Sequence, residues 1–178
     1  MQRVRNQRAT GRDMIISLAV ILLPAMAIYY FFSRTPAEPE VPVADWKPVV
    51  ADARTEAPYD ILAPSNLPET WKPVRARYGN DELQLGFLSP DKVYFEVKQR
   101  VGANQPGFIS TVTREGRQDG TSEVATAAGV KRTWKRYLTG DERSHCLVSA
   151  VEGKRPSTTI VCGDVPYEGV EAFASTLA

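Results

Sequence analysis

The chain has 178 residues, with 22 Lys plus Arg, 21 Asp plus Glu and a single His, so its formal net charge is +1. This near-neutral balance argues against a nucleic-acid-binding protein, which usually carries a basic excess. One His and two Cys leave little material for a metal cluster or a histidine-based catalytic site. The charge is unevenly spread, because residues 1–13 carry four Arg against one Asp, whereas residues 33–178 carry 18 basic and 20 acidic side chains.

An uncharged run of nineteen residues, Met14–Phe32, follows the basic start. As a helix it would be about 28 Å long, close to the hydrocarbon thickness of a bilayer, so we expect a single-pass transmembrane helix at 14–32 in the plasma membrane. The arginines place residues 1–13 in the cytoplasm as a basic tail. A signal peptide cleaved after Ala27, at an A-x-A sequence, is the alternative. Both interpretations place residues 33–178 outside the cytoplasm.

Prolines are concentrated just beyond this run. Residues 33–44 have spaced prolines and no apolar period, so we expect a Pro-rich tether of up to about 37 Å, at about 3.1 Å per residue. The apolar residues of 46–57 then have helical spacing, with Asp45 as a cap and Pro58 as a stop. We predict an amphipathic helix there, with further tether as the alternative. The extracytoplasmic α+β domain is expected at 45–178.

Strict apolar–polar alternation appears in three consecutive runs, 74–78, 83–87 and 93–97. A period of two predicts strands with one buried and one solvated face, hence an antiparallel β-meander. Further strands are predicted at 122–126, 130–138, 143–151 and 158–163. Glycine and polar residues predict loops at 102–107 and 114–120. Residues 108–113 fit either a strand or a short helix opened by Pro106.

The last segment has apolar residues at helical spacing up to Leu177, with Asp164 as the expected N-cap and Pro166 in the first turn. Such a helix would cover the apolar side of the sheet. The predicted fold class is α+β: an N-terminal transmembrane helix, then an antiparallel β-meander sheet covered by a C-terminal helix.

Two cysteines fall in the predicted C-terminal hairpin. A loop centred on Lys154 pairs residues whose numbers sum to 308, which places Cys146 directly opposite Cys162. Opposed side chains approach closely enough for a cross-strand disulfide, and an oxidising compartment permits one. We expect a disulfide, with two reduced core cysteines as the alternative. His145 points to the other face of its strand, so it cannot serve as a base for Cys146.

A basic patch with aromatic side chains occurs in the predicted strand 130–138. Its possible ligand contacts, toward an anionic polymer or lipid headgroups, are Trp134, Arg132, Arg136 and Tyr137. We favour the simpler interpretation, in which Trp134 is a core residue, because residues 69–178 are nearly balanced, with 15 basic and 14 acidic side chains. Glycoside hydrolases use a pair of carboxylates, and paired acids occur at 81–82 and 141–142. Both pairs lie in predicted turns, where acidic residues are common for backbone reasons, so we favour a structural role for them.

Four parts of the sequence resemble one family: the Arg-rich start running into the apolar segment, residues 57–78, residues 85–99 and the closing FASTLA, 173–178. The most specific pieces are the pattern Pro64-x-x-Leu67-Pro68-x-x-Trp71 and the run LGFLSPD from Leu85 to Asp91. Together they are similar to an actinobacterial family of single-pass membrane proteins known as domain of unknown function 4245. The resemblance covers nearly the whole chain and implies an anchored, extracytoplasmic domain. It implies no activity, cofactor or catalytic residue.

The sequence contains no nucleophile elbow, phosphate loop, zinc-protease motif or dinucleotide fingerprint. We therefore expect a non-enzymatic interaction or accessory module of the cell envelope, with no cofactor and no metal. Its expected partners are the lipid bilayer, through 14–32, and another envelope protein, but no nucleic acid. A binding domain for a cell-wall glycan or lipid is the alternative.

Overall fold

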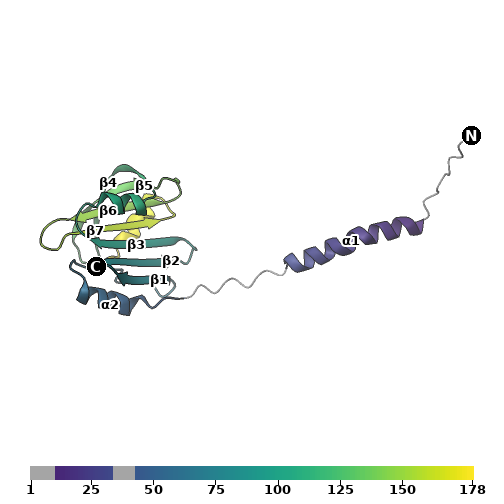
Figure 1. The fold of residues 1–178 in the computed structure, drawn as a ribbon, viewed down its shortest axis with the longest axis horizontal. Helices are drawn as coiled ribbons and strands as arrows, with labels where there is room; N and C mark the ends of the chain where they lie inside the picture. The colour runs from purple at the N-terminus through teal and green to yellow at the C-terminus, as the bar shows by residue number, and fades with distance from the viewer. Residues whose placement is uncertain (1–10, 34–42) are drawn as a thin grey trace, which may run out of the picture. The chain divides into compact units, whose positions relative to one another are not determined.

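The computed structural model describes residues 11–33 and 43–178. The chain divides into two compact units, residues 1–41 and 42–178. Most of the predicted basic tail and of the predicted tether lies outside the described residues (Figure 1).

The first unit contains helix α1, Gly11–Ser33, which includes Pro24. Large apolar side chains are exposed along it between Met14 and Tyr30. A helix covering the uncharged run agrees with the sequence. Among the described residues, however, no helix meets the length and hydropathy required of a membrane span.

The second unit is built on one seven-stranded antiparallel sheet with the order β1-β2-β3-β7-β6-β5-β4. The strands are β1 (Lys72–Gly79), β2 (Glu82–Leu88), β3 (Tyr94–Val101), β4 (Arg117–Ala125), β5 (Lys131–Leu138), β6 (His145–Val151) and β7 (Ser157–Gly163). Two meanders, β1–β3 and β4–β7, therefore join through the pairing of β3 with β7. The link from β3 to β4 crosses to the far edge of the sheet and contains helix α3, Pro106–Val112 (Figure 1). These elements confirm the α+β class and the antiparallel sheet.

Helices cover the two faces of the sheet unequally. We name the face beneath α2 (Trp46–Glu56), residues 57–64 and α4 (Tyr167–Ala174) the core face, and the opposite one the α3 face. The core face holds the main cluster of buried apolar side chains, which includes Trp134 and Phe173. The α3 face holds a smaller cluster around Phe108. The predicted C-terminal helix does cover the sheet, as α4.

One buried amide fixes the segment between α2 and β1 to the sheet. Gln99, in β3, accepts a hydrogen bond from Leu62 N at 2.8 Å and donates to Asp60 O at 3.2 Å. The Tyr59 hydroxyl donates to Gln99 O at 3.2 Å, below the same segment. Buried polar groups are stable only when paired, so Gln99 holds an irregular segment in place over the core face.

Strand β4 begins earlier than the sequence predicts. Glycine and polar residues at 114–120 predict a loop, but β4 starts at Arg117. Its pairing with β5 shifts register between Gln118 and Thr121, where Gly120 has a φ of +93°. A bulge of this kind lets a glycine-bearing polar segment pair as an edge strand.

The structure also determines where two helices begin. The ambiguous segment 108–113 belongs mainly to α3, whose first residue is Pro106. Asp164 does not cap α4, whose N-cap is Pro166. The Asp164 carboxylate instead accepts a hydrogen bond from the Ser144 hydroxyl. By contrast, α2 confirms the predicted helix at 46–57 to within one residue.

Candidate functional site

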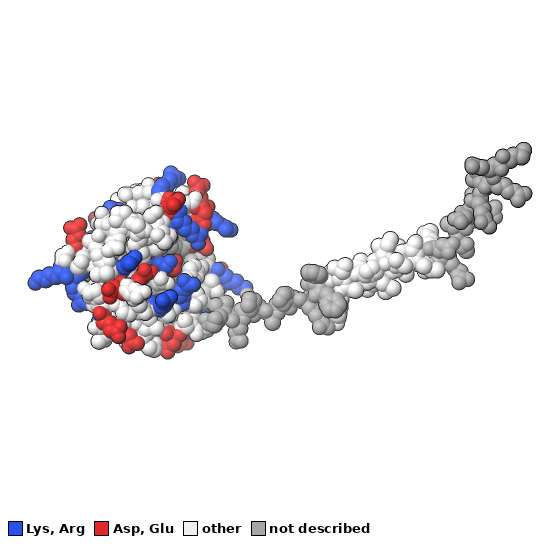
Figure 2. Space-filling view, in the orientation of Figure 1, with Lys and Arg blue, Asp and Glu red and all other residues white. Residues whose placement is uncertain are grey.

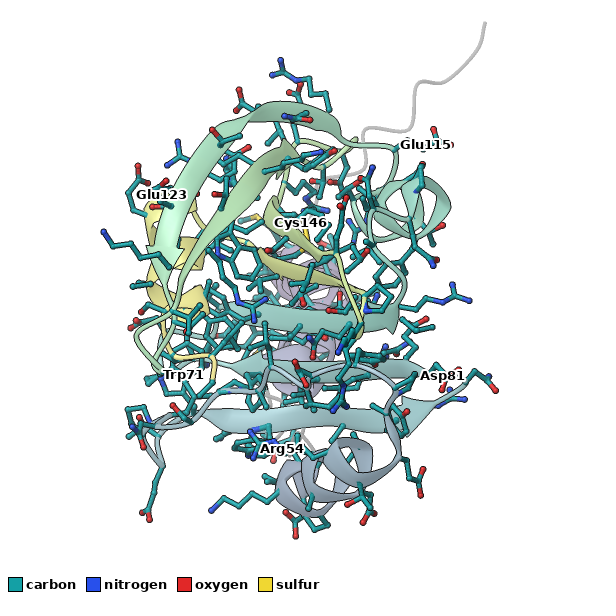
Figure 3. The ribbon with its side chains drawn as sticks, turned by 90° about the vertical axis from the view of Figure 1, so that its left-hand side faces the viewer. Arg54, Trp71, Asp81, Glu115, Glu123 and Cys146 are labelled. Carbon is teal, nitrogen blue, oxygen red and sulfur yellow. A yellow bond between two sulfur atoms is a disulfide. The ribbon has the colours of Figure 1, made fainter. Side chains whose placement is uncertain are left out.

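The cysteine hairpin has the predicted register. Cys146 pairs directly with Cys162 across β6 and β7, and a disulfide joins them with a Cα–Cα distance of 4.1 Å. Figure 3 shows Cys146 near the middle of the sheet. Both residues belong to the small apolar cluster of the α3 face, together with Phe108 and Ile160. The bond therefore links two neighbouring strands inside a packed cluster.

His145 lies on the core face, opposite to Cys146. Its ring contacts the ring of Tyr167, in α4, with centroids 4.5 Å apart in an edge-on arrangement. This placement agrees with the alternation of side chains along a strand. The disulfide and the opposed faces together leave no Cys–His pair.

The four possible ligand contacts in β5 do not share a surface. Arg132, Trp134 and Arg136 occupy every second position of β5 and so share one face. Tyr137 lies on the other face and packs against the cluster of the α3 face. Trp134 has no exposed surface. Arg136 pairs with Glu171, in α4, at 2.5 Å, and its guanidinium lies 4.9 Å from the Tyr167 ring centroid. Arg136 is thus engaged inside the fold, where it ties β5 to α4.

Four buried polar atoms have no hydrogen-bond partner in the part of the chain that the structure describes. They are Ser122 Oγ, Arg132 Nε, Trp134 Nε1 and His145 Nδ1. Burial also lowers the pKa of Arg132. Ser122 pairs with Trp134 across β4 and β5, whereas His145 pairs with Leu138, four residues further along β5. About 13 Å of strand therefore separates Ser122 from His145, which is too far for a Ser–His pair.

The described residues contain no cluster of three or more His, Cys, Asp or Glu side chains that could hold a metal ion. The second unit does have several surface hollows.

An apolar hollow opens at one end of the sheet, beside α4, and has a volume of about 280 Å³. We name it the Trp71 notch. Three stretches of the chain line it: the segment before β1, the turn between β2 and β3 with the start of β3, and the stretch 165–176. Its lining residues are Leu67, Pro68, Trp71, Ser89, Asp91, Val93, Phe95, Val165, Gly169, Ala172, Phe173 and Thr176. Figure 3 shows Trp71 at this end of the sheet.

Three aromatic rings in mutual contact form one wall of the notch. The Trp71 ring stacks on Phe173 at a centroid distance of 5.4 Å and lies 5.3 Å from Phe95. Phe95 and Phe173 are themselves stacked at 4.8 Å. Both phenylalanines are buried, whereas Trp71 is half-buried. Such a cluster is stiff, because each ring is held by two others.

Two small residues of α4, Gly169 and Ala172, line the notch. A Cβ added at Gly169 would lie 2.8 Å from Val165 Cγ2, so this position has no room for a side chain. Ala172, also on α4, lines the notch and is exposed.

A larger hollow of about 850 Å³ lies on the α3 face, and we name it the polar groove. Its lining includes Glu82, Gln84, Lys98 and Arg100, and the loop before α3. A smaller hollow beside it shares Arg100 and adds Arg77. Within the described residues, no acidic side chain pairs with either arginine. Figure 2 shows acidic and basic side chains interspersed over the visible face of the second unit.

Residues 7–177 match the model of a family described as "Protein of unknown function (DUF4245)". The chain belongs to this family. The match confirms the family predicted from the sequence, whereas the actinobacterial origin and the single membrane pass of this DUF4245 protein stay predictions. No curated protein and no solved structure matches the chain significantly.

Both interior segments that carry the family resemblance converge on the notch. Leu67, Pro68 and Trp71 come from the first segment, and Ser89 and Asp91 come from the second. In the sequence these residues are accounted for by turns or by the core, so the sequence does not predict a site at the notch. One signal was present: Trp71 is a large aromatic residue outside every predicted strand and helix.

Proposed function

We propose that this DUF4245 protein is a membrane-anchored, extracytoplasmic binding module of the cell envelope, and that the Trp71 notch holds an apolar group of its partner. The observation that carries this proposal is the open aromatic wall of the notch. In the described part of the second unit, the exposed large apolar side chains are only Val43 and Val130, and the notch gathers the half-buried Leu67, Trp71 and Val93 in one hollow. Binding sites are typically apolar hollows with a few polar groups at the rim.

The proposed anchor is the uncharged run 14–32. It is preceded by four arginines, lies within α1, and exposes apolar side chains along its described part. Tyr29 and Tyr30 stand near its end, where amphipathic rings favour a membrane interface. The proposal rests on these features of the sequence and of α1. Extraction of cell membranes with alkaline carbonate tests it, since an anchored chain stays in the pellet and a peripheral one is released.

Support for an extracytoplasmic domain comes from the disulfide of Cys146 and Cys162. Disulfides form and persist mainly in oxidising compartments. Protease added to intact protoplasts should remove residues 43–178 and spare the N-terminal tail. Protection of the whole chain would contradict the proposed orientation.

We propose binding rather than catalysis because both cysteines are joined in a disulfide, and the one histidine, His145, is about 13 Å of strand away from the buried Ser122 hydroxyl. The notch itself is lined mainly by carbon, with aromatic rings as its wall. Such a surface can hold and orient an apolar group, and the one titratable side chain in its lining, Asp91, is exposed to solvent.

Photocrosslinking of the full chain in its native membrane tests the notch. A photoreactive leucine analogue replaces Leu67, which lines the notch, and in a matched control it replaces Leu138, a half-buried leucine of β5 that does not. A crosslinked product formed from position 67 and absent from position 138 is the expected result. Equal products at both positions, or none at position 67, would contradict the proposal.

A second candidate is binding of a cell-wall glycan or similar polar ligand in the polar groove. The observation that favours it is that, within the described residues, Arg77 and Arg100 form no ion pair and lie beside a hollow of about 850 Å³. Arg100 also lies 5.9 Å from the Phe108 ring centroid. Co-sedimentation with isolated cell wall tests it: the double change Arg77→Gln and Arg100→Gln should weaken sedimentation, whereas Arg143→Gln, on an exposed turn, should not.

A further inference from the structure

We infer that the group held in the Trp71 notch is an acyl chain of a membrane lipid. This inference rests on the proposed function and names the chemistry of the occupant. Four observations lead to it: the lining of the notch, the state of its polar groups, its volume, and its place next to the start of the second unit.

Two of the three polar side chains that line the notch are already engaged, and the third, Asp91, is exposed to solvent. The Ser89 hydroxyl accepts a hydrogen bond from Val93 N at 3.1 Å, and the Thr176 hydroxyl donates to Phe173 O at 2.7 Å. The backbone of the Ser89 turn is paired as well, since Ser89 N donates to Val93 O at 2.8 Å. A peptide segment would bring N–H and C=O groups that need partners when buried. An acyl chain brings none, so the lining suits it better.

The volume suits a length of hydrocarbon. A methylene group occupies about the same space as a water molecule, for which the liquid volume is about 30 Å³. The 280 Å³ of the notch therefore holds about nine such groups. This is about half of a common acyl chain, with the remainder and the headgroup outside. Each buried methylene contributes to affinity through the hydrophobic effect.

The notch also lies next to the point where the chain reaches the second unit. Ala44 N donates a hydrogen bond to Pro73 O at 2.8 Å, and Trp71 is only two residues before Pro73. Two residues span at most about 7 Å. With 14–32 as the proposed anchor, the tether predicted from the sequence would let this end of the unit lie up to about 37 Å from the bilayer. Lipid is then the apolar ligand that is always within reach.

A lipid with a photoreactive acyl chain tests the inference on the full chain. The protein is reconstituted into phosphatidylcholine vesicles that contain a phosphatidylcholine with a diazirine near the end of one acyl chain, and the labelled peptides are located by mass spectrometry. We expect label on the notch peptides, 67–71 and 165–176, in addition to label on 14–32. Ala172→Phe occupies part of the notch and should reduce the notch label at least tenfold, the effect of losing about two buried methylene groups.

Ala51→Phe is the matched control, since Ala51 is an exposed residue of α2 that does not line the notch. It should leave the notch label unchanged. Excess unlabelled lysophosphatidylcholine should compete with the label in the unaltered chain, which gives the same answer without any substitution.

The outcomes separate this inference from the proposed function. Label on 14–32 alone would overturn the acyl-chain site and leave the anchor standing. Label on the notch peptides that survives both Ala172→Phe and competition would overturn the site as well, since it would reflect surface contact only. Label on the notch without label on 14–32 would support the acyl-chain site and overturn the anchor.

Discussion

The two faces of the sheet are stabilised in different ways. The core face packs large aromatic and aliphatic side chains beneath α2, residues 57–64 and α4. The α3 face has one small apolar cluster, crossed by the disulfide, and is otherwise polar. Packing thus holds one face, while a covalent bond supports the other. The Trp71 notch is where the packed face remains open, so we expect stability and ligand binding to depend on the same aromatic residues.

The largest expected effect is the loss of a core-face ring. Phe173 contacts Trp71, Phe87 and Phe95, and is buried. Phe173→Ala should lower the free energy of unfolding by about 3–5 kcal/mol, because it removes apolar contacts and leaves a cavity. Urea unfolding of the full chain in mild detergent measures this. Phe173→Leu should cost clearly less, and a loss below about 1 kcal/mol for the alanine variant would contradict the central place of this ring.

Next comes the disulfide on the opposite face. Its cysteines are 16 residues apart, and closing a loop of this length stabilises a fold by about 3 kcal/mol. The double change Cys146→Ala and Cys162→Ala should therefore lower the free energy of unfolding by about that amount. Adding a reductant to the unaltered chain should move the urea midpoint in the same direction. If the double variant proved less stable than Phe173→Ala, the disulfide would contribute more to the free energy of unfolding than the packing of the Phe173 ring does.

A third test uses alkaline pH to distinguish the faces. Burial raises the pKa of Tyr59, on the core face, far above its ordinary value of 10.0. Above pH 10 the unfolded chain loses this proton while the folded chain keeps it. Stability therefore falls as pH rises, by at most about 1.4 kcal/mol per pH unit for one group. Burial also raises the pKa of Tyr94, on the α3 face.

Urea midpoints at pH 8 and pH 11 measure this loss. Tyr59→Phe should reduce the difference between the two midpoints, and the remaining part should belong to groups such as Tyr94. An unchanged difference in the variant would show that Tyr59 does not titrate on unfolding in this range.

The smallest effect should come from the ion pair between β5 and α4. Arg136 and Glu171 are partly exposed, at 31% and 25%, so solvent screens their attraction. A double-mutant cycle with Arg136→Met and Glu171→Gln should give a coupling energy of about 0.5–1 kcal/mol. A value above about 3 kcal/mol would mean that α4 is held by charge more than by packing.

Local patterns were enough to predict much of the fold. The period of two and a short loop determine the register of the β6–β7 hairpin, and so the pairing of Cys146 with Cys162. An amphipathic spacing defines α2. These features depend on residues close together in the chain, where alternation or helical period is a direct signal.

Features that depend on distant residues could not be predicted in this way. Pairing of β3 with β7 joins residues about 60 positions apart, and no local period records it. The bulge that admits Arg117 into β4 depends on its partner strand. The Trp71 notch combines three segments between Leu67 and Thr176, each of which has its own structural explanation in turns or core.

Native mass spectrometry of the full chain, released from cell membranes, tests most directly whether the Trp71 notch is the binding site. The unaltered chain and Ala51→Phe should retain an added mass of lipid size, and Ala172→Phe should lose it while keeping its disulfide and its fold. The same added mass on all three chains, or on none of them, would contradict the account.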